Sequence, residues 1–238
     1  MSRRYLLVDD NVAFAENLAE ILREEGADVS IAHSGAAALE LIRHHRFDVL
    51  VTDMRMPAMN GAQLVHQVRR ADAGLPAIVV SAYSGDSDLR AAWSEGLLAV
   101  LPKPVPVGRL LELVARARRG GLVALVEDDP AFAENIAEVL RERGFSTITA
   151  RSIAETSELA SLRPFLALAD LRMPLTADGE PVRRLHAQFP WLHTFIVTAY
   201  AGEVALPTGV PVFEKPCDTS ALLGAIEREY EQTQAAGG

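Results

Sequence analysis

The strongest constraint on this chain is an internal repeat. Residues 13–26 recur at residues 131–144, and eleven of the fourteen aligned positions are identical. Three shorter matches follow in the same order: residues 52–57 with 169–174, 80–83 with 197–200, and 101–104 with 213–216. Because self-similarity at a nearly fixed offset marks a duplicated structural unit, we predict two similar domains at residues 1–119 and 122–238. Gly120 and Gly121 form the short junction between them.

Each copy alternates short apolar runs with segments of helical periodicity. In the first copy, five runs predict strands: Tyr5–Val8, Val29–Ala32, Val49–Thr52, Ala77–Ser81 and Ala99–Leu101. Helix-period segments follow them at residues 12–25, 35–45, 61–71, 86–96 and 106–119. Strands that are apolar at nearly every position are typical of parallel sheets covered on both faces. Five such units predict an α/β, doubly wound, flavodoxin-like domain with a five-stranded parallel sheet.

The second copy departs from this pattern in one place. Thr198 and Lys215 are 17 positions apart, whereas Ser81 and Lys103 in the first copy are 22 apart. Pro207, which is unfavourable inside a helix, lies in the shorter segment. We therefore predict a shortened fourth helix in the second copy.

Composition excludes several classes of protein. The net charge is -9, with 14 basic and 15 acidic residues at positions 1–120 and 9 basic and 17 acidic residues at positions 121–238. An acidic chain lacks the positive surface that nucleic acids require, so we expect no nucleic-acid partner. No apolar stretch approaches the roughly 20 residues of a membrane-spanning helix, so we expect a cytoplasmic protein without membrane association. The single cysteine, Cys217, predicts no internal disulfide.

Acidic side chains end two of the predicted strands in the first copy. Asp9 and Asp10 follow the first strand, and Asp53 follows the third. With strand order 2-1-3-4-5, the first and third strands are neighbours, and their carboxyl ends lie at the ligand-binding edge of the sheet. Close carboxylates raise one another's pKa unless a cation compensates them, and Mg²⁺ prefers oxygen ligands. This pattern predicts a Mg²⁺ site.

Lysine is rare in this chain and lies at matching places in the two copies. Of the 23 Lys and Arg residues, 21 are arginine, and Lys103 and Lys215 each precede a proline at the end of a fifth strand. Codon bias explains the scarcity but not the placement. Transfer of a phosphoryl group to a carboxylate requires cationic compensation of the phosphoryl oxygens, which a compact ammonium can supply. Ser81, at the end of the fourth strand, offers a hydroxyl to the same group.

Taken in order, these elements resemble the receiver domain of two-component response regulators. The resemblance rests on Val8-Asp9-Asp10, Asp53 with Met56-Pro57, Ser81-Ala82 and Lys103-Pro104, and it spans nearly all of both copies. It implies a CheY-like domain in which Asp53 accepts a phosphoryl group from phosphohistidine. The implied metal ligands are Asp9, Asp10, Asp53 and the main-chain carbonyl of Arg55, and the implied phosphoryl-binding residues are Ser81 and Lys103. The resemblance also implies a cis peptide bond before Pro104.

The same resemblance extends to the second copy, where it implies Asp170 as the acceptor. The implied metal ligands are Glu127, Asp128, Asp170 and the main-chain carbonyl of Arg172, with Thr198 and Lys215 as phosphoryl-binding residues. Glu127-Asp128-Asp129 permits two alignments, and the helix repeat at offset 118 selects Glu127 and Asp128 as the metal pair. Asp129 before Pro130 is then a helix N-cap. We thus expect one Mg²⁺ in each copy.

The resemblance also assigns two sets of modulating positions. Arg55, Tyr83, Arg172 and Tyr200 occupy positions that modulate autodephosphorylation, and their bulk predicts slow phosphate loss. The surface that docks histidine-bearing helices is formed by Ala13, Phe14, Asn17 and Glu20, repeated as Ala131, Phe132, Asn135 and Glu138. Recent duplication would also account for that identity. At the position of the family's aromatic reporter this chain has Val100 and Val212, so either the two tyrosines substitute or the relay is absent.

These features predict a tandem receiver that takes phosphoryl groups from a sensor histidine kinase or a histidine phosphotransfer protein. It would act through protein contacts, as a relay intermediate, phosphate sink or kinase regulator, and not as a turnover enzyme. We expect no output domain, because one helix and a frayed tail at residues 232–238 follow Lys215. The first copy, with its full fourth helix, retains a face suited to a homodimer. The alternatives are a haloacid-dehalogenase-like phosphotransferase, whose Asp-x-Asp pattern Asp9-Asp10-Asn11 lacks, and a non-phosphorylated receiver-like scaffold.

Overall fold

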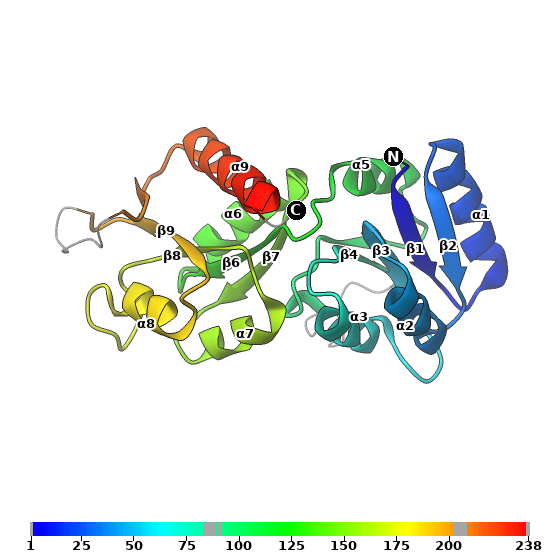
Figure 1. The fold of residues 1–238 in the computed structure, drawn as a ribbon, viewed down its shortest axis with the longest axis horizontal. Coiled ribbons are helices and arrows are strands. Elements are labelled where there is room, and N and C mark those ends of the chain that lie inside the picture. The colour runs from blue at the N-terminus through cyan, green and yellow to red at the C-terminus, as the bar shows by residue number, and fades with distance from the viewer. Residues whose placement is uncertain (1, 83–88, 90–91, 202–208, 237–238) are drawn as a thin grey trace. The chain divides into compact units, whose positions relative to one another are not determined.

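The computed structural model describes residues 2–82, 89, 92–201 and 209–236, which form two compact units (Figure 1). The division falls between Gly120 and Gly121, and residues 141–146 group with the first unit. Each unit contains one five-stranded sheet. No helix in the described ranges is long and apolar enough to cross a membrane.

The first sheet has the strand order β2-β1-β3-β4-β5, which confirms the predicted order. Its strands are β1 Arg4–Val8, β2 Asp28–Ala32, β3 Val49–Asp53, β4 Ala77–Ser81 and β5 Ala99–Pro102. Its helices are α1 Val12–Glu24, α2 Gly35–His44, α3 Gly61–Ala71 and α5 Val107–Arg116. The helix predicted at residues 86–96 lies partly outside the described residues; residues 89, 92 and 93 are helical. All strand pairs of this sheet are parallel, so the ends of β1 and β3 reach the same edge.

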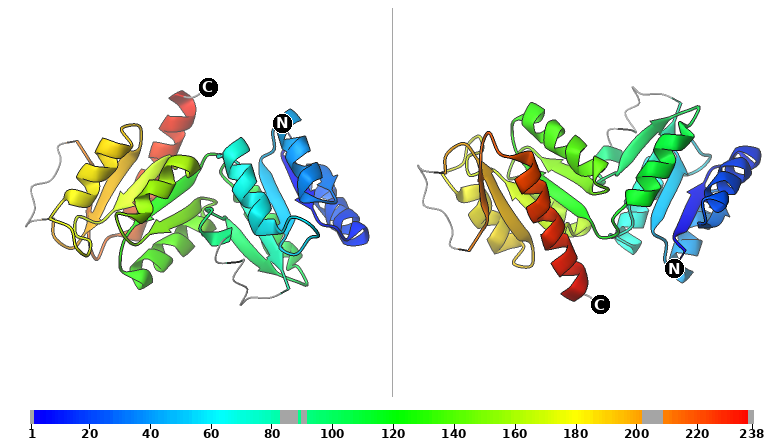
Figure 2. Two further views of the ribbon diagram at one scale, coloured as in Figure 1. Left: turned by 90° about the horizontal axis from the view of Figure 1, so that it is seen from below. Right: turned by 90° about the horizontal axis from the view of Figure 1, so that it is seen from above.

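Alternate residues of the central strands pack on opposite faces of the first sheet. Leu50 in β3 joins the apolar cluster with the buried side chains of α2 and α3, whereas Val49 and Val51 join the cluster with those of α1 and α5. Figures 1 and 2 show these helix pairs covering the two faces. Because both faces are covered, the strands contain apolar residues at nearly every position.

The second sheet repeats this topology, with order β10-β9-β8-β6-β7. Its strands are β6 Leu122–Val126, β7 Ser146–Ala150, β8 Leu166–Ala169, β9 His193–Thr198 and β10 Val212–Glu214. Its helices are α6 Pro130–Glu142, α7 Leu159–Leu162, α8 Glu180–Gln188 and α9 Thr219–Ala236, with a short 3₁₀ turn at Glu155–Glu158. The predicted shortening of the fourth helix falls on a segment whose residues 202–208 lie outside the described part of the chain.

The last helix corrects the prediction of a frayed tail from residue 232. Helix α9 continues to Ala236. The ring of Tyr230 packs edge-on against Phe165, with the ring centroids 5.5 Å apart, and the hydroxyl of Thr233 donates to the Glu229 carbonyl at 2.9 Å. Glu, Gln and Ala, which favour helix, make up most of residues 227–236. These contacts and propensities extend the helix beyond its apolar stripe.

Side-chain caps determine where α1 and α6 begin. The side chain of Asn11 accepts a hydrogen bond from the backbone N–H of Phe14 at 3.1 Å. Asp129 accepts from the N–H groups of Ala131 at 2.9 Å and Phe132 at 3.2 Å. The second cap confirms the predicted N-cap, with Pro130 as the first helical residue. Each cap directly follows two acidic residues, so one turn positions both the helix start and the acidic side chains.

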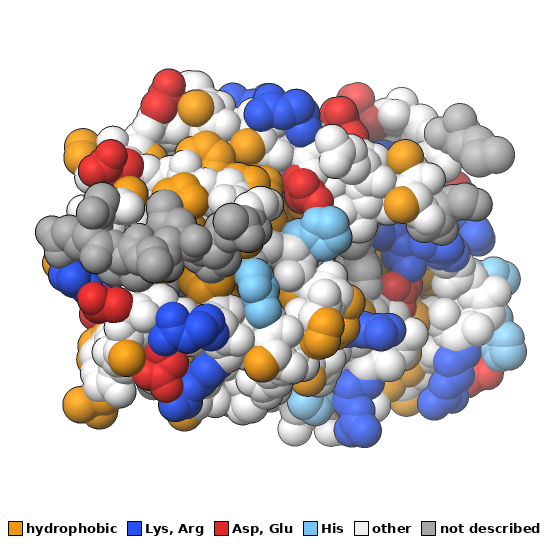
Figure 3. Space-filling view, turned by 60° about the vertical axis from the view of Figure 1, so that its left-hand side comes forward, with side chains coloured by type: hydrophobic (Ala, Val, Ile, Leu, Met, Phe, Trp, Pro, Cys, Tyr) orange, Lys and Arg blue, Asp and Glu red, His pale blue; other side chains and the backbone are white. Residues whose placement is uncertain are grey.

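Charged and apolar side chains share the surface. On the face in Figure 3, side chains of both charge signs are interspersed with hydrophobic ones. Among the described residues, Val12, Leu175 and Trp191 are large apolar side chains that remain exposed, on or beside different helices. Leu175 has a positive φ of 62° and lies in the loop between β8 and α8. The exposed apolar area of these three side chains is therefore divided among separate elements.

Candidate functional site

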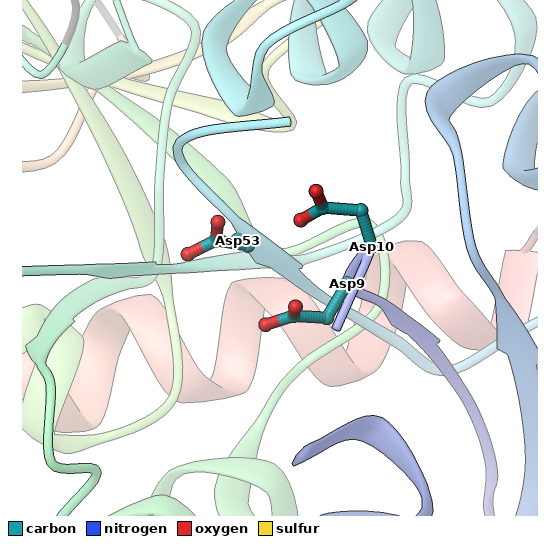
Figure 4. Close-up of side chains that lie close together, drawn as sticks. All are labelled: Asp9, Asp10 and Asp53. Carbon is teal, nitrogen blue, oxygen red and sulfur yellow. The ribbon is translucent and has the colours of Figure 1, made fainter. Parts of the chain in front are cut away.

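Three carboxylates meet at one edge of the first sheet. Asp9 and Asp10 directly follow β1, and Asp53 is the last residue of the neighbouring strand β3. One side-chain oxygen from each lies within 4.8 Å of the others (Figure 4). Asp9 and Asp53 are buried, whereas Asp10 is exposed. The predicted convergence of these three residues is confirmed.

Lys103 follows β5, an outermost strand of the sheet, and its side chain contacts the acidic cluster. Its Nζ lies 2.9 Å from Oδ2 of Asp9 and 2.7 Å from Oδ1 of Asp53. The backbone N–H of Lys103 donates to the carbonyl of Ser81 at 3.0 Å, which fixes the start of the side chain. Ser81 is buried at the end of β4, next to β3. The strand ends thus bring two buried carboxylates and an ammonium together, with Ser81 at the end of the strand between β3 and β5.

Backbone hydrogen bonds orient the two buried carboxylates. Oδ2 of Asp53 accepts from the N–H of Arg55 at 3.1 Å, and Oδ1 of Asp9 accepts from the N–H of Asn11 at 2.8 Å. Burial raises the pKa of Asp53 above its ordinary value, and the charge on Asp9 adds to the rise, against the opposing effect of Lys103. Burial by itself lowers the pKa of Lys103, but its hydrogen bonds to Asp53 and Asp9 outweigh that effect and raise it.

The second unit repeats the cluster with a glutamate in place of one aspartate. Side-chain oxygens of Glu127, Asp128 and Asp170 lie within 4.8 Å of one another. Nζ of Lys215 lies 2.6 Å from Oε2 of Glu127 and 2.8 Å from Oδ2 of Asp170. Thr198, at the end of β9, is fully buried, and its carbonyl accepts from the N–H of Lys215 at 2.8 Å.

The electrostatics of the second cluster follow from the same arrangement. Burial raises the pKa of Glu127, and the charge on Asp170 adds to the rise, against the opposing effect of Lys215. Burial alone lowers the pKa of Lys215, but hydrogen bonds to Asp170 and Glu127 reverse the shift and raise it. Glu127 thus pairs with the lysine of its own unit, Lys215, as Asp9 pairs with Lys103 in the first unit.

Both clusters have the donor set of a hard-cation site. Each combines three carboxylates, two buried and one exposed, at the carboxyl edge of a sheet. Mg²⁺ binds such oxygens while retaining several waters, so the residues present fit this ion. Both lysines precede a cis proline, at Lys103–Pro104 and Lys215–Pro216, which confirms the predicted cis bond before Pro104.

Comparisons with known proteins agree with this geometry. The response regulator receiver domain family matches residues 5–115. A response regulator receiver protein of Anaeromyxobacter sp. (strain Fw109-5) is 54% identical over 230 residues, which cover 97% of this chain and 96% of that protein. The chain belongs to the response regulator receiver family. The response regulator MprA of Mycobacterium ulcerans (strain Agy99) is 33% identical over 171 residues, 72% of each chain.

Solved receiver structures are similar to about half of the chain. A CheY-like response regulator receiver domain protein from Methanospirillum hungatei JF-1 is 29% identical, with a TM-score of 0.47, over 48% of this chain and 92% of that one. A response regulator receiver protein from Pseudomonas putida is 31% identical, with the same TM-score, over 48% of this chain and 97% of that one. Membership of the receiver family replaces the haloacid-dehalogenase-like alternative.

In the second unit, the two residues predicted to modulate phosphate loss, Arg172 and Tyr200, contact each other. The guanidinium carbon of Arg172 lies 3.8 Å from the ring centroid of Tyr200. Its Nε and Nη2 donate to Asp178 at 2.8 Å and 3.2 Å, and its backbone N–H donates to Asp170 at 3.2 Å. In the first receiver, Arg55 lies two residues after Asp53, and Tyr83 lies outside the described residues. Asp178 had no motif that could have identified it from the sequence.

The predicted docking residues separate into two kinds. Ala13, Asn17 and Glu20 are exposed on α1, as are Ala131, Asn135 and Glu138 on α6. Asn17 and Glu20 also line a surface hollow of α1. The rings of Phe14 and Phe132 are half-buried and lie against the lysines, with Nζ of Lys103 at 4.6 Å and Nζ of Lys215 at 4.2 Å from the ring centroids. Sequence reasoning missed this contact, although both phenylalanines were repeated at the same offset.

Proposed function

We propose that both receivers are phosphoryl acceptors, with Asp53 and Asp170 as the acceptor residues and one Mg²⁺ in each. The proposal rests on the acidic cluster with its lysine, which is assembled twice in one chain. The donor would be phosphohistidine on a sensor histidine kinase or a histidine phosphotransfer protein. The protein then acts through protein contacts, as a relay intermediate, a phosphate sink or a kinase regulator, and does not turn over a substrate.

The transfer step uses groups already in place in the first receiver. An oxygen of Asp53 attacks the phosphorus, the new P–O bond forms as the P–N bond of phosphohistidine breaks, and the electron pair returns to the imidazole nitrogen. Lys103, now hydrogen bonded to Asp53 and Asp9, can move its N–H donors to the phosphoryl oxygens. When bound by the carboxylates and the Arg55 carbonyl, Mg²⁺ supplies the remaining positive charge.

Ser81 completes the set on the neighbouring strand. Its hydroxyl lies at the end of β4, where it can hydrogen bond the arriving phosphoryl group. Thr198 and Lys215 take these roles in the second receiver, with Glu127, Asp128, Asp170 and the Arg172 carbonyl as the metal ligands. The exposed positions of Asp10 and Asp128 leave an open side through which the ion and the donor can approach.

Labelling with a small phosphodonor tests the proposal. Acetyl phosphate with Mg²⁺ should phosphorylate the wild type on both receivers, Asp53→Asn and Asp170→Asn on one each, and the double variant on neither. Chelation of Mg²⁺ should prevent labelling. Asp28→Asn is the matched control, because Asp28 begins β2 at the opposite end of the sheet.

Three outcomes would contradict the proposal. Labelling of the double variant would place the phosphoryl group elsewhere, and failure to label the wild type would favour the non-phosphorylated scaffold. Continuous release of phosphate from a phosphate ester would indicate a turnover phosphotransferase.

We further propose that one donor addresses both receivers, because α1 and α6 present the same exposed residues. A cognate kinase that labels the wild type and Asp53→Asn to the same stoichiometry would contradict this.

A further inference from the structure

In both receivers four contacts form a closed cycle that joins the site lysine, a carboxylate, a helix cap and an aromatic side chain. In the first, Asp9 accepts from the N–H of Asn11, the Asn11 side chain accepts from the N–H of Phe14, the Phe14 ring faces Nζ of Lys103, and Nζ donates back to Asp9. The contact distances are 2.8, 3.1, 4.6 and 2.9 Å in that order.

The second receiver contains the corresponding cycle of four contacts. Glu127 accepts from the N–H of Asp129 at 3.2 Å, and Asp129 accepts from the N–H of Phe132 at 3.2 Å. The Phe132 ring centroid lies 4.2 Å from Nζ of Lys215, which donates to Glu127 at 2.6 Å. Two of the four members differ in type from the first receiver, yet the phenylalanine and the lysine are the same.

We propose that Phe14 and Phe132 are positioning residues that hold Lys103 and Lys215 over the acceptor carboxylates. An ammonium has three N–H donors, and in the first receiver two of its neighbours are the carboxylates of Asp9 and Asp53. The negative face of an aromatic ring attracts the same cation. The ring therefore restrains a long, flexible side chain from the side that the carboxylates leave open.

The ring is itself held in place by the fold. Phe14 packs on the apolar cluster between the sheet and the helices α1 and α5, and its backbone N–H is the group that the N-cap of α1 binds. The cap residue is in turn bonded to the metal-binding Asp9. The position of the lysine is thus coupled through α1 to the acidic cluster.

This inference rests on the proposed phosphorylation and changes the role of one predicted docking position in each receiver. Ala13, Asn17 and Glu20 are exposed and remain predicted docking residues, whereas the half-buried Phe14 ring lies against Lys103. Acetyl phosphate needs no docking surface. It therefore separates a positioning residue from a docking residue.

The kinetic test uses the full chain with Asp170→Asn, so that labelling reports the first receiver. Phe14→Leu should slow phosphorylation by acetyl phosphate about three- to tenfold, as expected for loss of a cation–π contact. Phe14→Tyr, which keeps the aromatic face, should retain nearly the wild-type rate. Glu24→Gln, at the exposed last residue of the same helix, is the matched control, and its rate with acetyl phosphate should not change.

Two kinetic outcomes would overturn the proposal. One is an unchanged rate for Phe14→Leu with acetyl phosphate, combined with slower transfer from the kinase, which would make Phe14 a docking residue. The other is an equal loss in Phe14→Tyr and Phe14→Leu, which would make the role one of shape. If the parent variant accepts no phosphoryl group at all, the proposed function fails while the spectroscopic test below still applies.

The spectroscopic test exploits the two lysines of this chain. Isotope labelling of lysine gives one set of side-chain NMR signals from each site. The protons beside Nζ of Lys103 should be displaced by the Phe14 ring current in the wild type and should lose that displacement in Phe14→Leu. The Lys215 signals are the internal control for the fold and should not move. Lys103 signals that are unaffected by Phe14→Leu would refute the contact.

Discussion

Replacing Asp178 with alanine should speed the loss of phosphate from Asp170. Arg172 lies two residues after Asp170. Its Nε and Nη2 donate to Asp178 at 2.8 Å and 3.2 Å, and its guanidinium carbon lies 3.8 Å from the ring centroid of Tyr200. The prediction assumes the role proposed for Arg172, in which a guanidinium in this position hinders a water molecule that approaches the phosphorus. Removal of Asp178 frees the guanidinium to move away.

The magnitude follows from the exposure of the ion pair. The side chains of Arg172 and Asp178 are 36% and 50% exposed, so the pair is partly screened by water. Exposed pairs contribute roughly 0.2–1 kcal/mol. If that free energy favours the hindering position, its loss raises the population of the open position, and with it the rate of phosphate loss, by about 1.4- to 5-fold. The bidentate geometry favours the upper half of this range.

The assay measures decay of the phosphorylated protein after removal of acetyl phosphate, in an Asp53→Asn background that silences the first receiver. Glu180→Gln is the matched control at the start of α8, because Glu180 accepts from the N–H of Ala177 at 2.8 Å and pairs with Arg184. Its decay rate should stay near that of the parent. An unchanged or slower decay in Asp178→Ala, or an equal acceleration in Glu180→Gln, would refute the reasoning.

Two further predictions concern the stability of the sites. The pKa values of Lys103 and Lys215 are raised, so their ion pairs stabilise the fold below the ordinary lysine value of 10.5 and lose this contribution as the pH rises through the raised values. Urea unfolding from about pH 9 to pH 12 should show a steeper loss in the wild type than in Lys103→Met, and parallel curves would contradict this. Gly61→Ala should lower the free energy of unfolding by about 1–3 kcal/mol, because a Cβ there would lie 2.5 Å from the carbonyl oxygen of Asp53. Gly108→Ala, with open space around it, should instead be neutral or stabilising by up to about 1 kcal/mol; a Gly61→Ala protein as stable as this control would show that the α3 start can shift freely.

Much of each site could be predicted because strand ends of a parallel sheet converge by topology alone. Once the repeat and the alternation predict a doubly wound sheet, a residue that follows β1 and a residue that ends β3 lie close together whatever their rotamers. This reasoning placed Asp9, Asp53 and Lys103 together, and the structure confirms it. The register of the helix repeat similarly predicted that Asp129 caps α6, since a cap depends on residues three positions away.

The contacts that the sequence did not reveal depend on side-chain direction and loop length. Phe14 follows Asp10 by four residues, and the contact of its ring with Lys103 depends on the direction of its side chain, which the sequence does not show. In the loop that contains Asp178, the N–H of Gly179 donates to the carbonyl of Leu171 at 2.8 Å. In the first receiver, the N–H of Gly61 donates to the carbonyl of Met54 at the same distance. The second loop has one residue more, and that difference is not visible as a motif.

The sequence by itself determined the two receivers, their strand order and the residues that end their strands, because repeat offsets and apolar periodicity are properties of the chain. Only the tertiary structure decided what surrounds those residues. In the first receiver the residue before α3 is Asn60, which caps that helix, whereas its counterpart Asp178 accepts hydrogen bonds from the Arg172 side chain. Corresponding positions of the two loops thus make different contacts, because the partner that a side chain reaches depends on loop length and side-chain direction, which only the folded chain fixes.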